Sequence, residues 1–171
     1  MDLLEELRKE HSPAQTKRLA AWVGSDPGRF SRLFDLFSGE ERRLAQRASR
    51  VMDHVVESFP FLLEPHVDAF LGNLARQDLS DTVRRNSVRM LQFIDLPEAY
   101  HGEIARLCET FLQAPEQPVA VKAFSMTVLH RLTRLYPELA VDLIYHLEDR
   151  LAYEKPAYRS RAVKILRQLK R

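Results

Sequence analysis

The stretch that decides the fold is residues 81–91, DTVRRNSVRML, in which Val83, Ser87 and Leu91 are spaced four residues apart. Residues at this spacing lie on one face of an α-helix, so the stretch predicts a helix with a large–small–large stripe. The same stripe occurs in three more segments: Leu44, Ala48 and Met52; Val121, Ser125 and Leu129; Tyr158, Ala162 and Leu166. The first positions of successive stripes are 39, 38 and 37 residues apart. This period predicts an array of helix pairs, in which the small central residue lets another helix approach closely.

The rest of the chain also contains residues that typically mark the starts of helices. Prolines recur where first helical turns are expected: Pro13, Pro27, Pro60, Pro97, Pro118, Pro137 and Pro156. Ser12 with Gln15, and Ser38 with Glu41, have the spacing of capping boxes. Alternation with a period of two is absent over any strand length. We therefore expect about ten helices and no sheet, with helices near 60–76, 97–113 and 137–152 completing the pairs.

With its Asp81-Thr82-Val83-Arg84 segment, this pattern resembles the armadillo/HEAT type of helical repeat, in which antiparallel helix pairs of roughly 40 residues stack into a solenoid. Arg84 directly follows the first residue of its stripe, and Lys122 and Arg159 occupy the same position in their stripes. The earliest stripe departs from this pattern, because it has Ala45 there. The resemblance covers roughly residues 27–170. It implies that Arg84, Lys122 and Arg159 tie adjacent repeats together through acidic turn residues such as Asp81.

The resemblance implies an all-α fold, a right-handed α-α superhelix of about five antiparallel helical pairs. The expected organisation is a single solenoid domain over residues 1–171. It comprises an irregular N-terminal cap over 1–26, repeats over 27–154 and a basic C-terminal capping helix over 155–171.

The composition excludes several classes of protein. The 171 residues are 45% hydrophobic and carry a net charge of only +2, which fits a soluble domain with a core. No apolar run is long enough to span a bilayer, so no membrane partner is expected. The single cysteine, Cys108, cannot form an internal disulfide, and the acidic start lacks a leader pattern, so we expect a cytoplasmic protein. Charge is uneven, because residues 155–171 carry +7 with no acid.

The sequence offers no motif for catalysis. No two of its six histidines are three or four residues apart, and no glycine-rich phosphate loop is present. Cys108 lies beside Leu107 and Phe111, an apolar setting that favours a buried, inert thiol. We therefore expect no catalytic residue, no metal, no cofactor and no enzymatic activity.

A binding surface emerges when the four stripes are overlaid. Three residues after the first stripe position stand Arg47, Asn86, Phe124 and Arg161, and six residues after it stand Arg50, Arg89, Thr127 and Lys164. These positions share one side of each helix. Since the second helix of each HEAT pair lines the concave face, they would form a partly basic strip. The candidate binding residues are Arg47, Arg50, His54, Arg89, Phe124, Arg131, Arg161 and Lys164.

Three interpretations of this strip remain open. It could anchor the carboxylates of an acidic protein or peptide, or it could follow the phosphates of a nucleic acid. Alternatively, its arginines keep a helical face soluble, paired with neighbours such as Asp53, Glu57 and Asp95. We favour a non-catalytic scaffold or adaptor that binds another, acidic protein or peptide through the concave face, with nucleic-acid binding as the alternative. A second copy could cover an exposed end of the stack as a homodimer.

Overall fold

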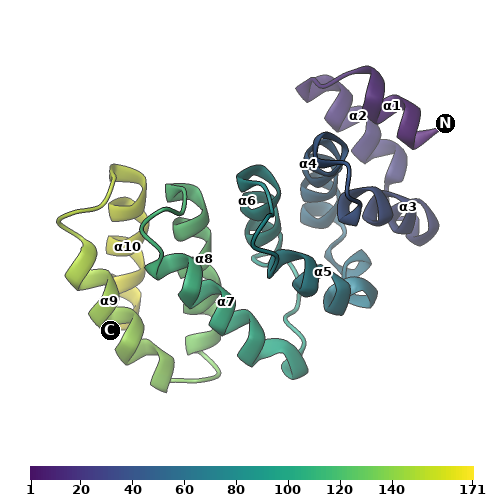
Figure 1. The fold of residues 1–171 in the computed structure, drawn as a ribbon. Helices are drawn as coiled ribbons and strands as arrows, with labels where there is room; N and C mark the ends of the chain where they lie inside the picture. Colours follow the sequence, from purple (N-terminus) through teal and green to yellow (C-terminus); the bar gives the residue numbers. More distant parts are fainter. The chain divides into compact units, whose positions relative to one another are not determined.

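The computed structural model describes residues 1–171, which form ten α-helices and no strand (Figure 1). The helices are α1 Leu3–Lys9, α2 Pro13–Val23, α3 Pro27–Ser38, α4 Arg42–Ser58, α5 Val67–Leu74, α6 Asp81–Met90, α7 His101–Gln113, α8 Val119–Thr133, α9 Glu138–Arg150 and α10 Pro156–Leu169. Short 3₁₀ turns occupy Pro60–Leu62, Glu64–His66 and Glu98–Tyr100. The expectation of an all-α fold with about ten helices is confirmed.

The chain divides into two compact units, residues 1–95 and 96–171. The first unit contains α1 to α6, and in it α4 packs against α2, α3 and α6. The second unit contains α7 to α10, and in it α8 packs against α7, α9 and α10. In each unit, therefore, the helices that carry successive stripes lie against one another, α4 with α6 and α8 with α10.

The four stripes form the centre of this packing. All twelve of their residues are buried, including Ala48 and Ser87 at 0% exposure in the middle of α4 and α6. A large side chain at either position would hold the two helices apart, because a packed interior has no spare volume. The sequence pattern thus predicted both the helices and the faces that they bury.

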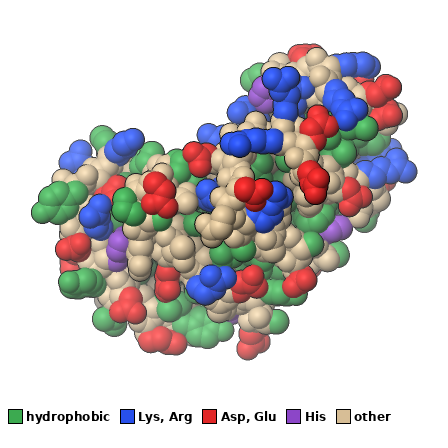
Figure 2. All heavy atoms as spheres, viewed as in Figure 1, with side chains coloured by type: hydrophobic (Ala, Val, Ile, Leu, Met, Phe, Trp, Pro, Cys, Tyr) green, Lys and Arg blue, Asp and Glu red, His purple; other side chains and the backbone are tan.

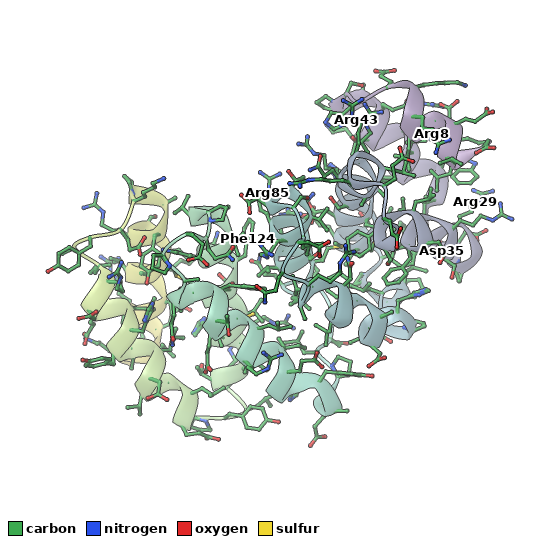
Figure 3. All side chains as sticks on the ribbon, in the orientation of Figure 1. Arg8, Arg29, Asp35, Arg43, Arg85 and Phe124 are labelled. Atoms are coloured by element: carbon green, nitrogen blue, oxygen red, sulfur yellow. The ribbon has the colours of Figure 1, made fainter.

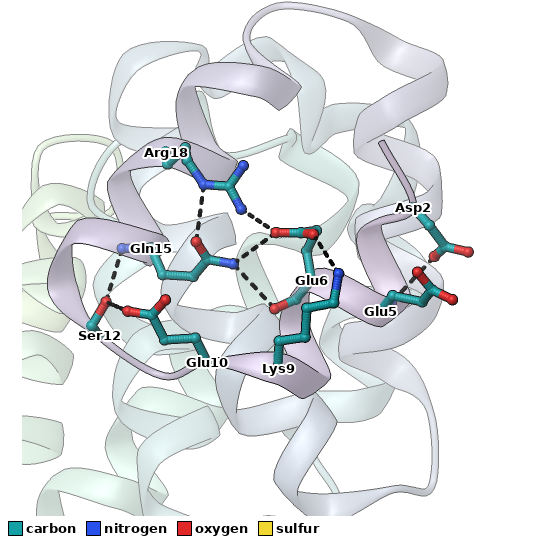
Figure 4. Close-up of polar contacts among 8 residues, drawn as sticks. All are labelled: Asp2, Glu5, Glu6, Lys9, Glu10, Ser12, Gln15 and Arg18. Atoms are coloured by element: carbon teal, nitrogen blue, oxygen red, sulfur yellow. Dashed lines mark hydrogen bonds and ion pairs between the residues drawn. The ribbon is translucent and has the colours of Figure 1, made fainter.

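A polar network holds α1 to α2 at the start of the chain (Figure 4). The carboxylate of Glu6 accepts hydrogen bonds from Lys9 Nζ at 3.1 Å, from Gln15 Nε2 at 3.2 Å and from Arg18. These donors favour the ionised carboxylate, and with Gln15 as the largest contributor they lower the pKa of Glu6 to about 2. Helices α1 and α2 are therefore joined to each other by charged hydrogen bonds.

The two capping-box predictions had different outcomes. Ser12 does cap α2, since its Oγ accepts from the Gln15 amide at 3.0 Å, but the Gln15 side chain reaches Glu6 in place of the Ser12 amide. The prediction at Ser38 is wrong. Ser38 is the last residue of α3, and α4 begins after Glu41, which makes no side-chain cap. Helix α3 continues through the expected cap because Phe34 and Phe37 bury its last turn.

The Glu6→Gln variant is expected to destabilise the protein at neutral pH but not in strong acid. A carboxylate whose pKa is lowered in the folded state stabilises that state at pH values above the pKa of the unfolded chain, here 4.5. This stabilisation disappears as the pH falls toward the folded-state pKa of about 2. Urea unfolding followed by circular dichroism should therefore show a difference between wild type and variant that shrinks across this range. Glu5→Gln, on an exposed position of the same helix, is the control. A difference that stays constant with pH would contradict the assignment.

Candidate functional site

A polar hollow of about 270 Å³ opens on the first unit, lined by residues at the start of α2 and on α4 and α6. Its lining residues are His11, Ser12, Pro13, Thr16, Arg50, Asp53, His54, Arg85 and Asn86. Helix α4 packs against both α2 and α6, which brings these three segments together although they are distant in sequence. Two of the candidate binding residues, Arg50 and His54, therefore meet in one site.

The positive charge of the hollow comes from Arg50 and Arg85. Arg85 is half-buried on α6, where Figure 3 labels it, and Arg50 is exposed on α4. Neither side chain forms an ion pair or a hydrogen bond with the chain. Most arginines of this unit are engaged with acidic side chains or backbone carbonyls: Arg8, Arg18, Arg29, Arg47, Arg76, Arg84 and Arg89. Figure 2 shows Lys and Arg side chains with a histidine gathered over α2 and α4. The guanidinium groups of Arg50 and Arg85 are thus available to a ligand.

Two ionisable groups in the hollow have displaced pKa values. Loss of water around its ring, followed by the positive charges of Arg50 and Arg47, lowers the pKa of His11. Burial raises the pKa of Asp53, and a hydrogen bond from Arg89 partly offsets that rise. His11 is therefore neutral at pH 7, and a bound anion would raise its proton affinity.

Arg89 is occupied within the fold. Its Nη1 lies 2.8 Å from Asp53 Oδ2, its Nη2 lies 3.2 Å from Glu57 Oε2, and its guanidinium carbon lies 4.9 Å from the centre of the Phe93 ring. These contacts join α4 to α6 and to the segment that follows α6. The pairing with Asp53 and Glu57 matches the alternative in which some strip arginines are neutralised by their neighbours.

Arg47 is also occupied, at the end of α1. Its Nη1 donates to the carbonyl oxygens of Leu7 at 2.6 Å and of Arg8 at 3.0 Å. Carbonyls in the last turn of a helix lack intrahelical donors, and a cation stabilises that end of the helix dipole. Arg47 therefore attaches α1 to α4, and its charge acts within the unit.

Seven of the nine residues that line the hollow were not among the candidates drawn from the sequence, and three of these seven, Arg85, Asn86 and His11, show why. Arg85 lies two residues after the first stripe position, so an overlay restricted to the third and sixth positions missed it, although it stands four residues before Arg89 on the same helix. Asn86 was placed on the strip, but it is buried and its Nδ2 donates to Ser49 Oγ at 2.9 Å, linking α6 to α4. His11 could not be placed because the register of the first helices was not known from the stripes.

The other four candidates lie in the second unit, on α8 and α10. Arg161 donates to Thr127 Oγ1 at 2.6 Å, and its guanidinium carbon lies 5.9 Å from the centre of the Phe124 ring. Phe124 and Arg131 are half-buried on α8, whereas Lys164 is exposed on α10. Arg161 and Phe124 thus join the two stripe helices of this unit.

The residues expected to tie repeats together differ in what they contact. Lys122 Nζ on α8 lies 3.1 Å from Glu154 Oε1 in the turn between α9 and α10, and both side chains are nearly buried. This ion pair joins one helix pair to the next. Arg84 instead lies 3.7 Å from Asp81 on its own helix and donates to the carbonyl of Arg76 at 3.3 Å, and Arg159 is exposed.

The structure also locates the residues considered for chemistry. Cys108 is completely buried, as predicted, and burial raises the pKa of its thiol to about 12, so it is a thiol at neutral pH. No group of three or more histidine, cysteine or carboxylate side chains is arranged to hold a metal ion. None of the ten helices combines the length and the apolar character needed to cross a bilayer.

Comparison with known proteins agrees with the fold. A model of the HEAT repeat domain matches residues 3–169, so the match includes α1 and α2, which the sequence pattern had left as an irregular cap. No curated protein and no solved structure shows significant similarity to the chain. The chain belongs to the HEAT repeat family, whose helical-repeat scaffolds commonly mediate interactions between proteins.

Proposed function

We propose that this HEAT repeat protein is a non-catalytic scaffold that binds an acidic segment of a partner protein on the surface formed by α2, α4 and α6. The observation that carries the proposal is the pair of arginines, Arg50 and Arg85, which line one hollow and have no anionic partner in the chain. Guanidinium groups bind carboxylates through paired hydrogen bonds. An acidic peptide would supply the anions that the fold does not.

The spacing of the available charge favours a protein ligand over a nucleic acid. A protein that follows a phosphate backbone presents a track of cations, each neutralising one phosphate. Here the strip is interrupted, because Arg47 is held by carbonyls of α1 and Arg89 by Asp53 and Glu57. What remains of the strip in the first unit is Arg50, which lines the same hollow as Arg85 in one localised cluster that suits a few anionic side chains.

Selection of short random peptides against the immobilised protein tests this function. Enriched peptides should be acidic, and they should lose about tenfold or more in affinity for the Arg50→Glu/Arg85→Glu variant, because a charged hydrogen bond to each arginine is lost and a repulsion is added. The matched control is Arg32→Glu, which changes an exposed arginine on α3 outside the hollow. Affinities are measured by fluorescence anisotropy.

Two results would contradict the proposal. The first is a set of selected peptides that bind wild type and the double variant equally well. The second is a labelled oligonucleotide that binds more tightly than any selected peptide, with an affinity that falls steeply between about 50 and 200 mM salt. That second result would support the nucleic-acid alternative.

A further inference from the structure

The charge balance of the hollow indicates more than a general preference for acids. Asp53 is the only carboxylate that lines the hollow; its Oδ2 is paired with Arg89 at 2.8 Å and its Oδ1 is buried. The charges of Arg50 and Arg85 therefore stay uncompensated, giving a local charge of about +2. A single carboxylate brings one negative charge, whereas a phosphate monoester brings about −1.5 to −2 at pH 7.

The donors around the hollow match a phosphate group in number. Each guanidinium group carries five N–H donors, and none of those on Arg50 or Arg85 is used within the chain. The imidazoles of His11 and His54 are exposed at the same hollow. A phosphate monoester has three terminal oxygens that accept several hydrogen bonds at once, which exceeds what one carboxylate can accept.

The start of α2 makes a smaller contribution to the attraction of an anion. This helix of eleven residues begins at the hollow with Ser12 and Pro13, so the positive end of its dipole lies there. The hydroxyls of Ser12 and Thr16 donate elsewhere, to Glu10 and to the Ser12 carbonyl. Glu10, the C-cap residue of α1, is an acid that contacts the lining, through its hydrogen bond from Ser12.

The size of the hollow suits a side-chain group. Its volume of about 270 Å³ is just below the range of pockets for drug-sized ligands. A phosphorylated serine or threonine fits such a space while the peptide backbone stays outside it.

We propose that the hollow between Arg50, Arg85, His11 and His54 is a binding site for a phosphorylated serine or threonine of the partner protein. The inference rests on the proposed function and narrows it, since phosphorylation of the partner becomes the event that switches binding on. Arg50 and Arg85 each hold phosphate oxygens, and the two histidines contact the same group at its rim.

The first test uses inorganic phosphate with the full-length protein at pH 7. Titration is followed by NMR of the arginine Nε–H and histidine ring signals, with acetate at matched ionic strength as the comparison. We expect phosphate to shift the signals of Arg50, Arg85, His11 and His54 at concentrations at which acetate shifts them only slightly. Arg50→Gln and Arg85→Gln should each weaken phosphate binding about tenfold or more, and Arg32→Gln should leave it unchanged. Circular dichroism checks that the variants are folded.

The second test uses an acidic peptide from the selection described above, prepared with serine, phosphoserine or aspartate at its central position. The phosphoserine form should bind at least about tenfold more tightly than the other two, and Arg50→Gln should abolish this advantage. A 5′-phosphorylated oligonucleotide is titrated in parallel. Tighter binding of that oligonucleotide than of the phosphopeptide would overturn the inference.

The outcomes separate the two proposals. If phosphate shifts none of the four residues and the three peptides bind equally well, the phosphate site is wrong while the acidic-peptide scaffold stands. If neither phosphate nor any acidic peptide binds at the hollow, both proposals fail.

Discussion

Replacing Tyr158 with alanine is expected to lower the free energy of unfolding by about 3–5 kcal/mol, the range found when buried aromatic side chains are truncated. Tyr158 begins the fourth stripe and is completely buried in α10, the helix that packs against α8. Its removal leaves a cavity that a packed interior cannot fill. Urea unfolding followed by circular dichroism measures the change.

Tyr158→Phe is the control for this prediction. The Tyr158 hydroxyl is buried without a hydrogen-bond partner, and burial raises its pKa to about 12. Removing an unsatisfied polar group while keeping the ring is expected to be neutral or slightly stabilising. If Tyr158→Phe were as damaging as Tyr158→Ala, the hydroxyl and not the ring would be the stabilising group, and the packing argument would be wrong.

The second large effect is expected at the ion pair between Lys122 and Glu154. Lys122→Ala leaves the Glu154 carboxylate, whose side chain is 11% exposed, without its lysine, and breaking a buried pair in this way costs about 3–5 kcal/mol. The guanidinium of Arg150 remains 3.4 Å from the same carboxylate and still offsets part of its charge. The loss in free energy of unfolding should therefore be near the lower end of this range. The free energy of unfolding at pH 7 is the measured quantity.

Two comparisons distinguish a buried pair from an ordinary one. The double variant Lys122→Met/Glu154→Met should recover most of the lost stability, because neither charge is then left buried alone. Arg8→Ala breaks the pair with Glu41, whose side chains are 58% and 51% exposed, and should cost no more than about 1 kcal/mol. Equal losses in Lys122→Ala and Arg8→Ala would show that burial does not strengthen the pair.

The helices and their buried faces were predictable because both depend on local patterns. Val83, Ser87 and Leu91 are neighbours along one helix, so their spacing alone indicates which face is apolar. The end of α3 was not predictable in the same way. Ser38 and Glu41 have the spacing of a capping box, which predicts that a helix begins after Ser38. Burial of Phe37 instead extends α3 to Ser38. Packing outweighs a capping preference that contributes only about 1 kcal/mol.

The repeat overlay treated Arg50 and Arg89 as equivalent, since both stand six residues after the start of a stripe. The sequence by itself determined that both lie on the same side of their helices, because a helix has a fixed period. Only the tertiary structure decided that Arg89 meets Asp53 and Glu57 while Arg50 meets no acid. An ion pair between helices depends on the distance between side chains more than 30 residues apart in sequence, and that distance exists only after α4 and α6 have packed.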